Sequence, residues 1–211
     1  MNTLHLAELE RLPEIPKGFM KSGRNQLKMF RELGLSRDSK ILDYGCGWLR
    51  SGVWFIDYLE PNNYYGIEPW NERLDMGKSK VLWEGLMEEK QPSFDRNENW
   101  DCSVFGVKFD FCLASSIWSH CGKDDIRIML SNFRDCSHPS AVFVTSFWRA
   151  TESSKDYSGD RWIGKNKHDN QGVSKIHHDL EALRDICREC GFESEDLFPR
   201  QKYSWLKLTK I

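Results

Sequence analysis

The chain has 211 residues, of which 39% are apolar and 29% charged, a composition typical of a globular domain. Its net charge of −2 gives no general attraction to nucleic acid, and no apolar run approaches the roughly eighteen residues of a transmembrane helix. The first residues lack the basic and then apolar order of a signal peptide. We therefore expect one domain over residues 1–211, located in the cytoplasm, with neither a nucleic-acid nor a membrane partner.

Cysteine and tryptophan are the two informative residue types in the composition. The seven cysteines are odd in number and scattered, so we expect them to be reduced and mostly buried. Cys187 and Cys190 have a Cys-x-x-Cys spacing, but they fall within an expected helix and lack a second pair, so no metal site is expected. The nine tryptophans either fill a bulky core or include some that stack on a planar ligand or a sugar.

The amino-terminal part is expected to form an arm and then a helix. Residues 1–18 contain two prolines and form either a lid-like arm or a simple cap of the domain. Residues 19–34 place their apolar side chains near one helical face, and Gly34 is a plausible end.

Residues 41–47 read Ile-Leu-Asp-Tyr-Gly-Cys-Gly, a buried strand end followed by a glycine turn. Glycine has no Cβ, so the backbone of such a turn can approach a ligand closely. Residues 49–59 favour a helix, which Pro61 terminates. The amino end of that helix directs free N–H groups toward the turn.

Residues 64–67 predict a second strand, which ends in Glu68 before Pro69. An acid about twenty residues after the glycines can accept hydrogen bonds from both hydroxyls of a ribose. A dinucleotide fingerprint requires a third glycine where Arg50 stands. Asp43 would also repel a pyrophosphate, whereas it tolerates the positive end of an amino acid. These residues favour a nucleoside cofactor with an amino-acid tail.

A strand, Asp-x-Gly-x-Gly and a Glu after the next strand together resemble the class I S-adenosylmethionine-dependent methyltransferases. Leu49 departs from the pattern where the family usually has a third glycine. The resemblance implies a three-layer α/β sandwich with a seven-stranded, mostly parallel sheet whose last strand is antiparallel. It also implies S-adenosylmethionine as cofactor and S-adenosylhomocysteine as product. The cofactor contacts that it implies are Asp43, Gly45, Cys46, Gly47, Glu68 and Pro69.

Arg24 lies on the helix that precedes the first strand, where it could bind the methionyl carboxylate or form solvated surface. Residues 70–90 look helical, and residues 91–103 are polar and rich in turns. In the resembled family the region of the third strand contacts adenine, which makes Trp100 or Asp101 the candidate here.

Residues 109–116 predict a strand that ends in two small residues, Ser115 and Ser116. Small side chains there leave room for the sulfonium end of the cofactor and for the substrate. Residues 117–120 follow, where the resembled family keeps a catalytic or substrate-facing loop. Trp118 is a candidate substrate contact. His120 is the candidate base for a hydroxyl acceptor, with a structural or capping histidine as the alternative.

Residues 124–136 predict a helix, and the β-branched and aromatic residues 141–147 predict the fifth strand. Trp148 at the end of this strand is a candidate substrate contact. Residues 149–175 form a polar insertion, which we expect to cover the substrate rather than to be merely flexible.

The last predicted helix covers residues 177–191, and His177 and His178 at its start are candidate substrate contacts. Two strands follow, around residues 194–198 and 203–209. The order of these elements matches the seven-stranded methyltransferase pattern.

The predicted function is methyl transfer from S-adenosylmethionine to a small molecule or a carbohydrate, with oxygen as the expected acceptor atom. No Asp-Pro-Pro-Tyr or Asn-Pro-Pro-Tyr follows the fourth strand, and no Pro-Cys dipeptide is present, which argues against methylation of adenine or cytosine. Two alternatives stay open: a cofactor-binding module without activity, and a Rossmann enzyme that uses NAD or another nucleotide. The acceptor and the oligomeric state are also open.

Overall fold

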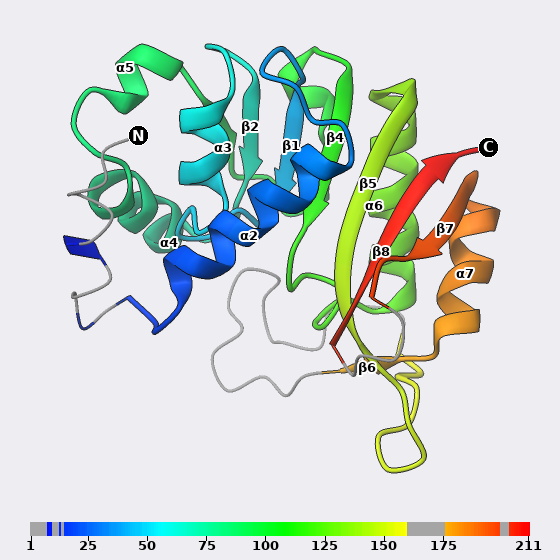
Figure 1. Cartoon of the computed structure of the whole chain (residues 1–211). Helices are drawn as coiled ribbons and strands as arrows, with labels where there is room; N and C mark the ends of the chain where they lie inside the picture. The colour runs from blue at the N-terminus through cyan, green and yellow to red at the C-terminus, as the bar shows by residue number, and fades with distance from the viewer. Residues whose placement is uncertain (1–7, 10–12, 14, 160–175, 199–202) are drawn as a thin grey trace. The chain divides into compact units, whose positions relative to one another are not determined.

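The computed structural model describes residues 8–9, 13, 15–159, 176–198 and 203–211 (Figure 1). It divides into two compact units, Met1–Arg96 and Asn97–Ile211. Most of the predicted arm 1–18 and residues 160–175 of the predicted insertion lie outside the described residues. The assignment of a single domain therefore stays a prediction.

Among the residues described for the first unit, three parallel strands form a sheet: β1 (Ile41–Tyr44), β2 (Tyr64–Ile67) and β3 (Ser93–Asp95). β2 lies between the other two. Every residue of β1 and β2 is buried, which explains why both read as short apolar runs. The predictions for these two strands are confirmed, whereas β3 was not delimited from the sequence.

Two helices of the first unit pack on each other, α2 (Phe19–Glu32) and α3 (Gly52–Tyr58). The rings of Phe30 and Phe55 lie 5.2 Å apart at this contact. The predicted helix 19–34 is confirmed. The helix predicted over 49–59 begins later, because Leu49 has a φ of 60° and residues 48–51 form turns.

The prediction of one continuous helix over 70–90 is wrong. The chain forms α4 (Asn71–Met76), a π-helical segment η1 (Gly77–Val81) and α5 (Leu86–Lys90). Gly85, with a φ of 83°, precedes α5 and separates it from the turns before it. The apolar content of this segment was read correctly, but the helix is interrupted at residues 82–85, where Leu82 is extended and Gly85 has a positive φ.

The described part of the second unit contains a 3₁₀ turn η2 (Ser103–Phe105) and five strands. The strands are β4 (Phe109–Ala114), β5 (Ser137–Arg149), β6 (His177–His178), β7 (Phe192–Asp196) and β8 (Tyr203–Lys210). β4 and β6 pair parallel with β5. β8 lies between β5 and β7 and is antiparallel to both, so the prediction of an antiparallel last strand is confirmed.

β5 begins earlier than the predicted residue 141, so Pro139 lies within this strand. The register between β4 and β5 shifts here, from Phe109 opposite Ser137 to Phe111 opposite Val142. Proline cannot donate a ladder hydrogen bond, and an irregular stretch is where a strand tolerates it.

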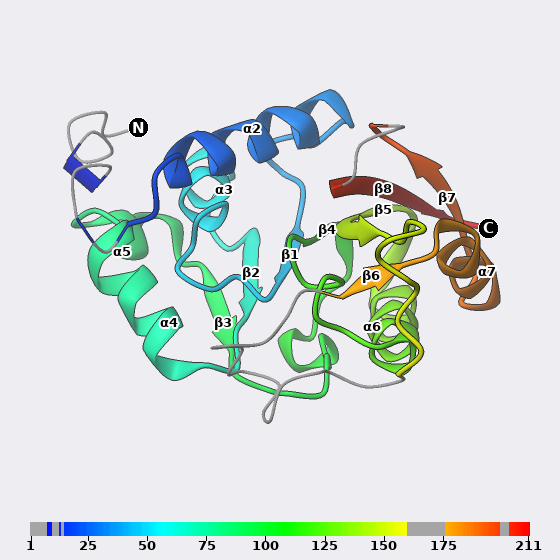
Figure 2. The ribbon, with the colours of Figure 1, turned by 90° about the horizontal axis from the view of Figure 1, so that it is seen from below.

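Two helices, α6 (Lys123–Asp135) and α7 (Leu180–Glu189), lie on the same face of the strands of the second unit (Figure 2). The predicted start of the last helix is wrong. Asp179 is its N-cap and accepts the Ala182 N–H at 2.9 Å, while the two histidines before it form β6.

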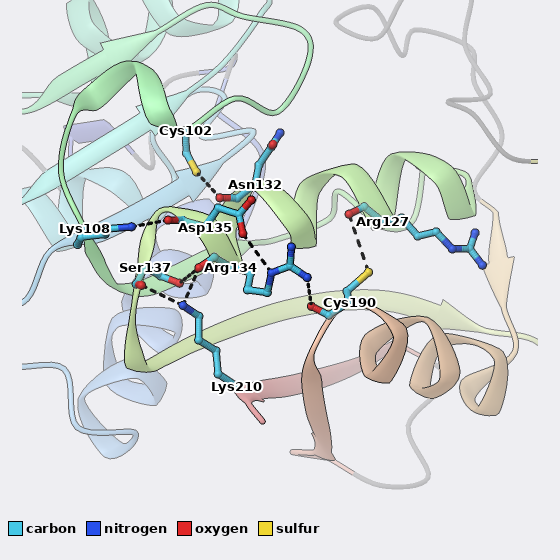
Figure 3. Close-up of polar contacts among 9 residues, drawn as sticks. All are labelled: Cys102, Lys108, Arg127, Asn132, Arg134, Asp135, Ser137, Cys190 and Lys210. Carbon is cyan, nitrogen blue, oxygen red and sulfur yellow. Dashed lines mark hydrogen bonds and ion pairs between the residues drawn. The ribbon is translucent and has the colours of Figure 1, made fainter.

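Lysine side chains hold the carboxyl end of α6 (Figure 3). Lys210 Nζ donates to the Arg134 carbonyl at 2.6 Å and to the Ser137 carbonyl at 2.9 Å, and Lys108 donates to the Asp135 carbonyl. The last turn of a helix leaves carbonyls unpaired at the negative end of its dipole, so cations are favoured there. This end of α6 is therefore joined to β8 and to the loop before β4.

The seven cysteines are free and six of them are buried, as predicted. Among the helices of the described part, none is both long and apolar enough to cross a bilayer.

Candidate functional site

The glycine turn after β1 bends across the end of β2. Gly45 and Gly47 have φ values of 65° and 53°, in the left-handed region that favours glycine. The Gly45 and Cys46 N–H groups both donate to the Ile67 carbonyl, at 2.8 and 3.2 Å. The turn is thus held next to the residue that follows β2.

Glu68 is the acid that the sequence placed after β2, and its carboxylate lies against the glycine turn. Its Oε2 accepts the Gly47 N–H at 3.0 Å, and its Oε1 accepts the Trp70 N–H at 3.0 Å. The residue is only 4% exposed. Two residues that are 21 positions apart in the chain are therefore brought together, and a carboxylate offers about four acceptor positions in all.

Asp43 lies at the end of β1 and is 3% exposed. Its Oδ2 accepts the hydroxyl of Tyr64 at 2.8 Å. Burial raises the pKa of Asp43 to about 7, although the Tyr64 hydrogen bond and the charge of Arg50 act in the opposite direction. Tyr64 is a partner that sequence reasoning missed, because only the pairing of β1 with β2 brings it to Asp43.

Cys46 contributes its backbone to the turn, while its side chain is buried. A Cβ on Gly66 would lie 2.8 Å from the Cys46 sulfur and 3.0 Å from the Phe94 ring, so only glycine leaves space for this thiol. Burial raises the pKa of Cys46 well above its usual value, which keeps the thiol protonated and unreactive.

Arg24 and Pro69 are the remaining candidates for cofactor contacts in the first unit. Pro69 is half-buried directly after Glu68, and Arg24 is exposed on α2. Its neighbour Gly23 packs closely on the Arg50 carbonyl and on Trp54, where a Cβ would not fit. Arg24 therefore lies near the segment that follows the glycine turn, and its contact with a carboxylate stays a prediction.

In the second unit, hydroxyl groups join the ends of β4 and β5 to the start of β8. The Ser116 N–H donates to Ser146 Oγ at 2.8 Å, and both serine hydroxyls lie 2.7 Å from the Tyr203 hydroxyl. Ser115 and Ser116 are half-buried, as is Tyr203. Sequence reasoning found the two serines after β4 but missed Ser146 and Tyr203, which carry no local signal.

Trp148 and His177 are brought together, as strand partners on β5 and β6. The Trp148 ring lies 4.8 Å from the Tyr203 ring and 6.2 Å from the His177 ring. All three side chains are half-buried. They form an aromatic cluster beside the hydroxyl network.

Trp118 and His178 lie elsewhere, in the interior of the second unit. Both are completely buried. Trp118 packs against Phe143 with the ring centres 6.1 Å apart, and the His178 ring contacts the carbonyls of Trp118 and Cys121 at 3.0 Å each. Neither side chain presents surface to a substrate in this structure, so direct contact of either one with a substrate stays a prediction.

His120 and Trp100 are the last two candidates. His120 is half-buried in the turns after β4, where its backbone N–H donates to the Ile117 carbonyl at 2.9 Å. Trp100 is 4% exposed and has a φ of 62°. Its indole N–H lies 3.5 Å from the carboxylate of Asp125 on α6. A role for Trp100 at adenine stays a prediction.

Comparison with known proteins places the fold. No family model and no curated protein sequence matches the chain. Among solved structures, the magnesium protoporphyrin IX methyltransferase ChlM from Synechocystis PCC 6803, with bound S-adenosylmethionine, matches with a TM-score of 0.65. That alignment covers 98% of this chain and 90% of ChlM at 14% identity. The chain has the class I methyltransferase fold.

Two further methyltransferase-fold structures match over nearly their whole length. CcbJ from Streptomyces caelestis aligns with a TM-score of 0.66 and 13% identity, over 97% of this chain and 95% of CcbJ. DesVI from Streptomyces venezuelae aligns with a TM-score of 0.65 and 14% identity, over 100% of this chain and 98% of DesVI. The predicted fold, a mostly parallel α/β sheet with helices as in the class I methyltransferases, is thus confirmed.

Proposed function

We propose that the chain is an S-adenosylmethionine-dependent methyltransferase that acts on a small molecule or a glycan sugar, with oxygen as the acceptor atom. The observation that carries the proposal is the 3.0 Å hydrogen bond from the Gly47 N–H to the Glu68 carboxylate. It joins the glycine turn of β1 to the acid after β2, the two features that a bound nucleoside needs. The class I methyltransferase fold supports the same assignment.

The residues of the first unit suit a nucleoside that carries an amino acid. Glu68 would accept hydrogen bonds from the ribose hydroxyls, and the turn at Gly45 and Gly47 would leave the backbone open to close approach. Asp43 would become fully ionised next to the ammonium group of the methionyl tail. The bound cofactor supplies a methyl group already activated on a sulfonium.

The second unit supplies candidates for the acceptor. Trp148, His177 and Tyr203 offer flat aromatic surfaces on which a sugar or a planar small molecule can stack. His120 would take the proton from an acceptor hydroxyl, because an imidazole is a suitable base near neutral pH. Alignment of the acceptor with the sulfonium methyl is the main requirement of the reaction.

Thermal unfolding with candidate ligands tests the proposal. At a hundred times its dissociation constant, a ligand stabilises the folded state by about 2.7 kcal/mol, which corresponds to roughly 5–10 °C for a chain of this size. We expect this shift with S-adenosylhomocysteine and none with NAD. The opposite result would favour a nucleotide-using Rossmann enzyme. Transfer of label from a radioactive methyl donor to small molecules or glycans then separates an enzyme from an inactive binding module.

Replacing Gly47 by alanine is expected to lower the affinity for S-adenosylhomocysteine at least tenfold. The new Cβ would lie 3.8 Å from Glu68 Oε2, in the space where the backbone is proposed to meet the cofactor. Gly106→Ala is the matched control, because Gly106 has a similar φ of 64° and no atom within 4 Å of the added Cβ. Both variants should lose a similar stability of about 1 kcal/mol. Equal affinities in calorimetry would remove Gly47 from the cofactor site.

Replacing His120 by alanine is expected to lower turnover at least a hundredfold while leaving the affinity for S-adenosylhomocysteine within twofold of the unmodified protein. The reason is that a general base contributes to the chemical step and not to cofactor binding. Methyl transfer assays and calorimetry measure the two quantities separately. Full turnover in the variant would show that His120 is not the base.

A further inference from the structure

We propose that His178 is a positioning residue, which fixes the turn that carries His120 by donating one hydrogen bond to two backbone carbonyls of that turn. The inference rests on the proposed function for the catalytic role of His120, but the geometry that it describes can be tested without any activity.

The contacts of the His178 ring define its protonation. Nε2 lies 3.0 Å from the Trp118 carbonyl oxygen and 3.0 Å from the Cys121 carbonyl oxygen. A carbonyl oxygen only accepts, so Nε2 must carry the proton and share it between the two carbonyls. The ring is completely buried, so no water competes for this N–H.

The two carbonyls lie on either side of His120 in the sequence. Within the turn, the N–H groups of His120 and Cys121 both donate to the Ile117 carbonyl, at 2.9 and 3.2 Å. The Ile176 N–H adds a backbone hydrogen bond to the Ser119 carbonyl at 3.1 Å. The turn is therefore tied to the segment around β6 by one side chain and one backbone group.

Charged groups lie on the other side of the His178 ring. Nδ1 lies 4.0 Å from Asp156 Oδ1, which accepts the Asp179 N–H at 2.9 Å. Lys123, the first residue of α6, donates to Asp156 Oδ2 at 2.5 Å. Burial lowers the pKa of His178, which keeps the ring neutral near pH 7 with its single proton on Nε2. The same cluster anchors α6, which begins where the turn ends.

The consequence for catalysis follows from the demand for alignment. A displacement of about 1 Å in a reacting group can cost about a hundredfold in rate. A turn that loses the Nε2 hydrogen bond leaves two buried carbonyls without this donor, and we expect it to become mobile. Turnover should fall, while cofactor binding in the first unit should not change.

Two variants separate hydrogen bonding from packing. Glutamine can place an amide N–H near the position of Nε2, whereas methionine has similar bulk and no donor. We expect His178→Met to speed hydrogen exchange of the His120 and Cys121 amides at least tenfold and to lower kcat at least tenfold. His178→Gln should retain exchange and kcat within about threefold, and both variants should bind S-adenosylhomocysteine normally. His138→Gln, on an exposed histidine of β5, is the control and should change neither.

The unmodified protein gives a second readout that does not depend on the folding of a variant. Nitrogen NMR of its imidazoles should show His178 protonated at Nε2 and unprotonated at Nδ1. A proton on Nδ1 alone, or unchanged amide exchange in a folded His178→Met protein, would overturn the inference. Failure of the proposed function has a different signature, namely that the unmodified protein does not bind S-adenosylhomocysteine.

Discussion

Replacing Glu68 by glutamine is expected to weaken the binding of S-adenosylhomocysteine at least a hundredfold, which corresponds to about 2.7 kcal/mol. The ribose hydroxyls are proposed to donate to this carboxylate. Glutamine has one acceptor oxygen, and its NH₂ group would face the N–H of either Gly47 or Trp70, both of which now donate to Glu68. Isothermal calorimetry measures the loss.

Glu60→Gln is the matched control for this experiment. Glu60 is half-exposed and accepts a hydrogen bond from Arg37 at 2.7 Å, so its loss should leave the affinity within twofold. The unfolding midpoint of the Glu68→Gln protein checks that the turn still forms. A folded Glu68→Gln protein that binds the ligand as tightly as the unmodified one would remove Glu68 from the ribose role.

Replacing Asp43 by asparagine is expected to stabilise the protein at pH 8 and to weaken cofactor binding. The carboxyl is buried and its pKa is raised to about 7, so ionisation at pH 8 opposes folding. The asparagine side chain has the same shape and can still accept the Tyr64 hydroxyl. It carries no charge for the ligand ammonium, and we expect the affinity for S-adenosylhomocysteine to fall at least tenfold.

The raised pKa of Asp43 makes the free energy of unfolding depend on pH. Between the unfolded pKa of about 4 and the folded value of about 7, the native state binds more protons at Asp43 than the unfolded state. Its contribution to the free energy of unfolding therefore falls by about 1.4 kcal/mol for each pH unit in this window. Urea unfolding of the unmodified and Asp43→Asn proteins from pH 4 to 8 should show that difference.

Asp38→Asn, on an exposed aspartate of the same unit, is the control and should not reproduce the difference. The affinity of the unmodified protein for S-adenosylhomocysteine should instead increase as the pH rises through about 7. The reason is that the ammonium group of the ligand interacts favourably with the ionised form of Asp43. A stability difference that stays constant with pH would show that Asp43 ionises normally.

The part of the site that the sequence predicted well depends on neighbours in the chain. β1, its glycine turn and β2 follow from short apolar runs and from glycines whose φ is positive. The spacing to Glu68 then implied a contact across adjacent strands, and the structure contains the Gly47 to Glu68 hydrogen bond. Each of these inferences needed only about thirty consecutive residues, which is the length of one strand, helix and strand unit.

What the sequence did not predict depends on distant partners. The hydroxyl of Tyr203 reaches Ser116 across 87 positions, and no local pattern indicates that pairing. His177 and His178 continue the helical periodicity that follows them, but pairing with Trp148 and Arg149 makes them a strand instead. Tertiary pairing therefore decided both the hydroxyl network and the start of α7, where periodicity alone favoured a longer helix.

The position of β8 has a consequence for biosynthesis. β7 precedes β8 in the sequence, but β8 lies between β5 and β7. β7 can therefore join the sheet of the second unit only once β8 has paired with β5. Lys210 on the same strand also secures the end of α6. While Tyr203–Lys210 is still inside the ribosome, β7 lacks the strand with which it pairs. The second unit should therefore become resistant to proteases only after β8 has been translated and released.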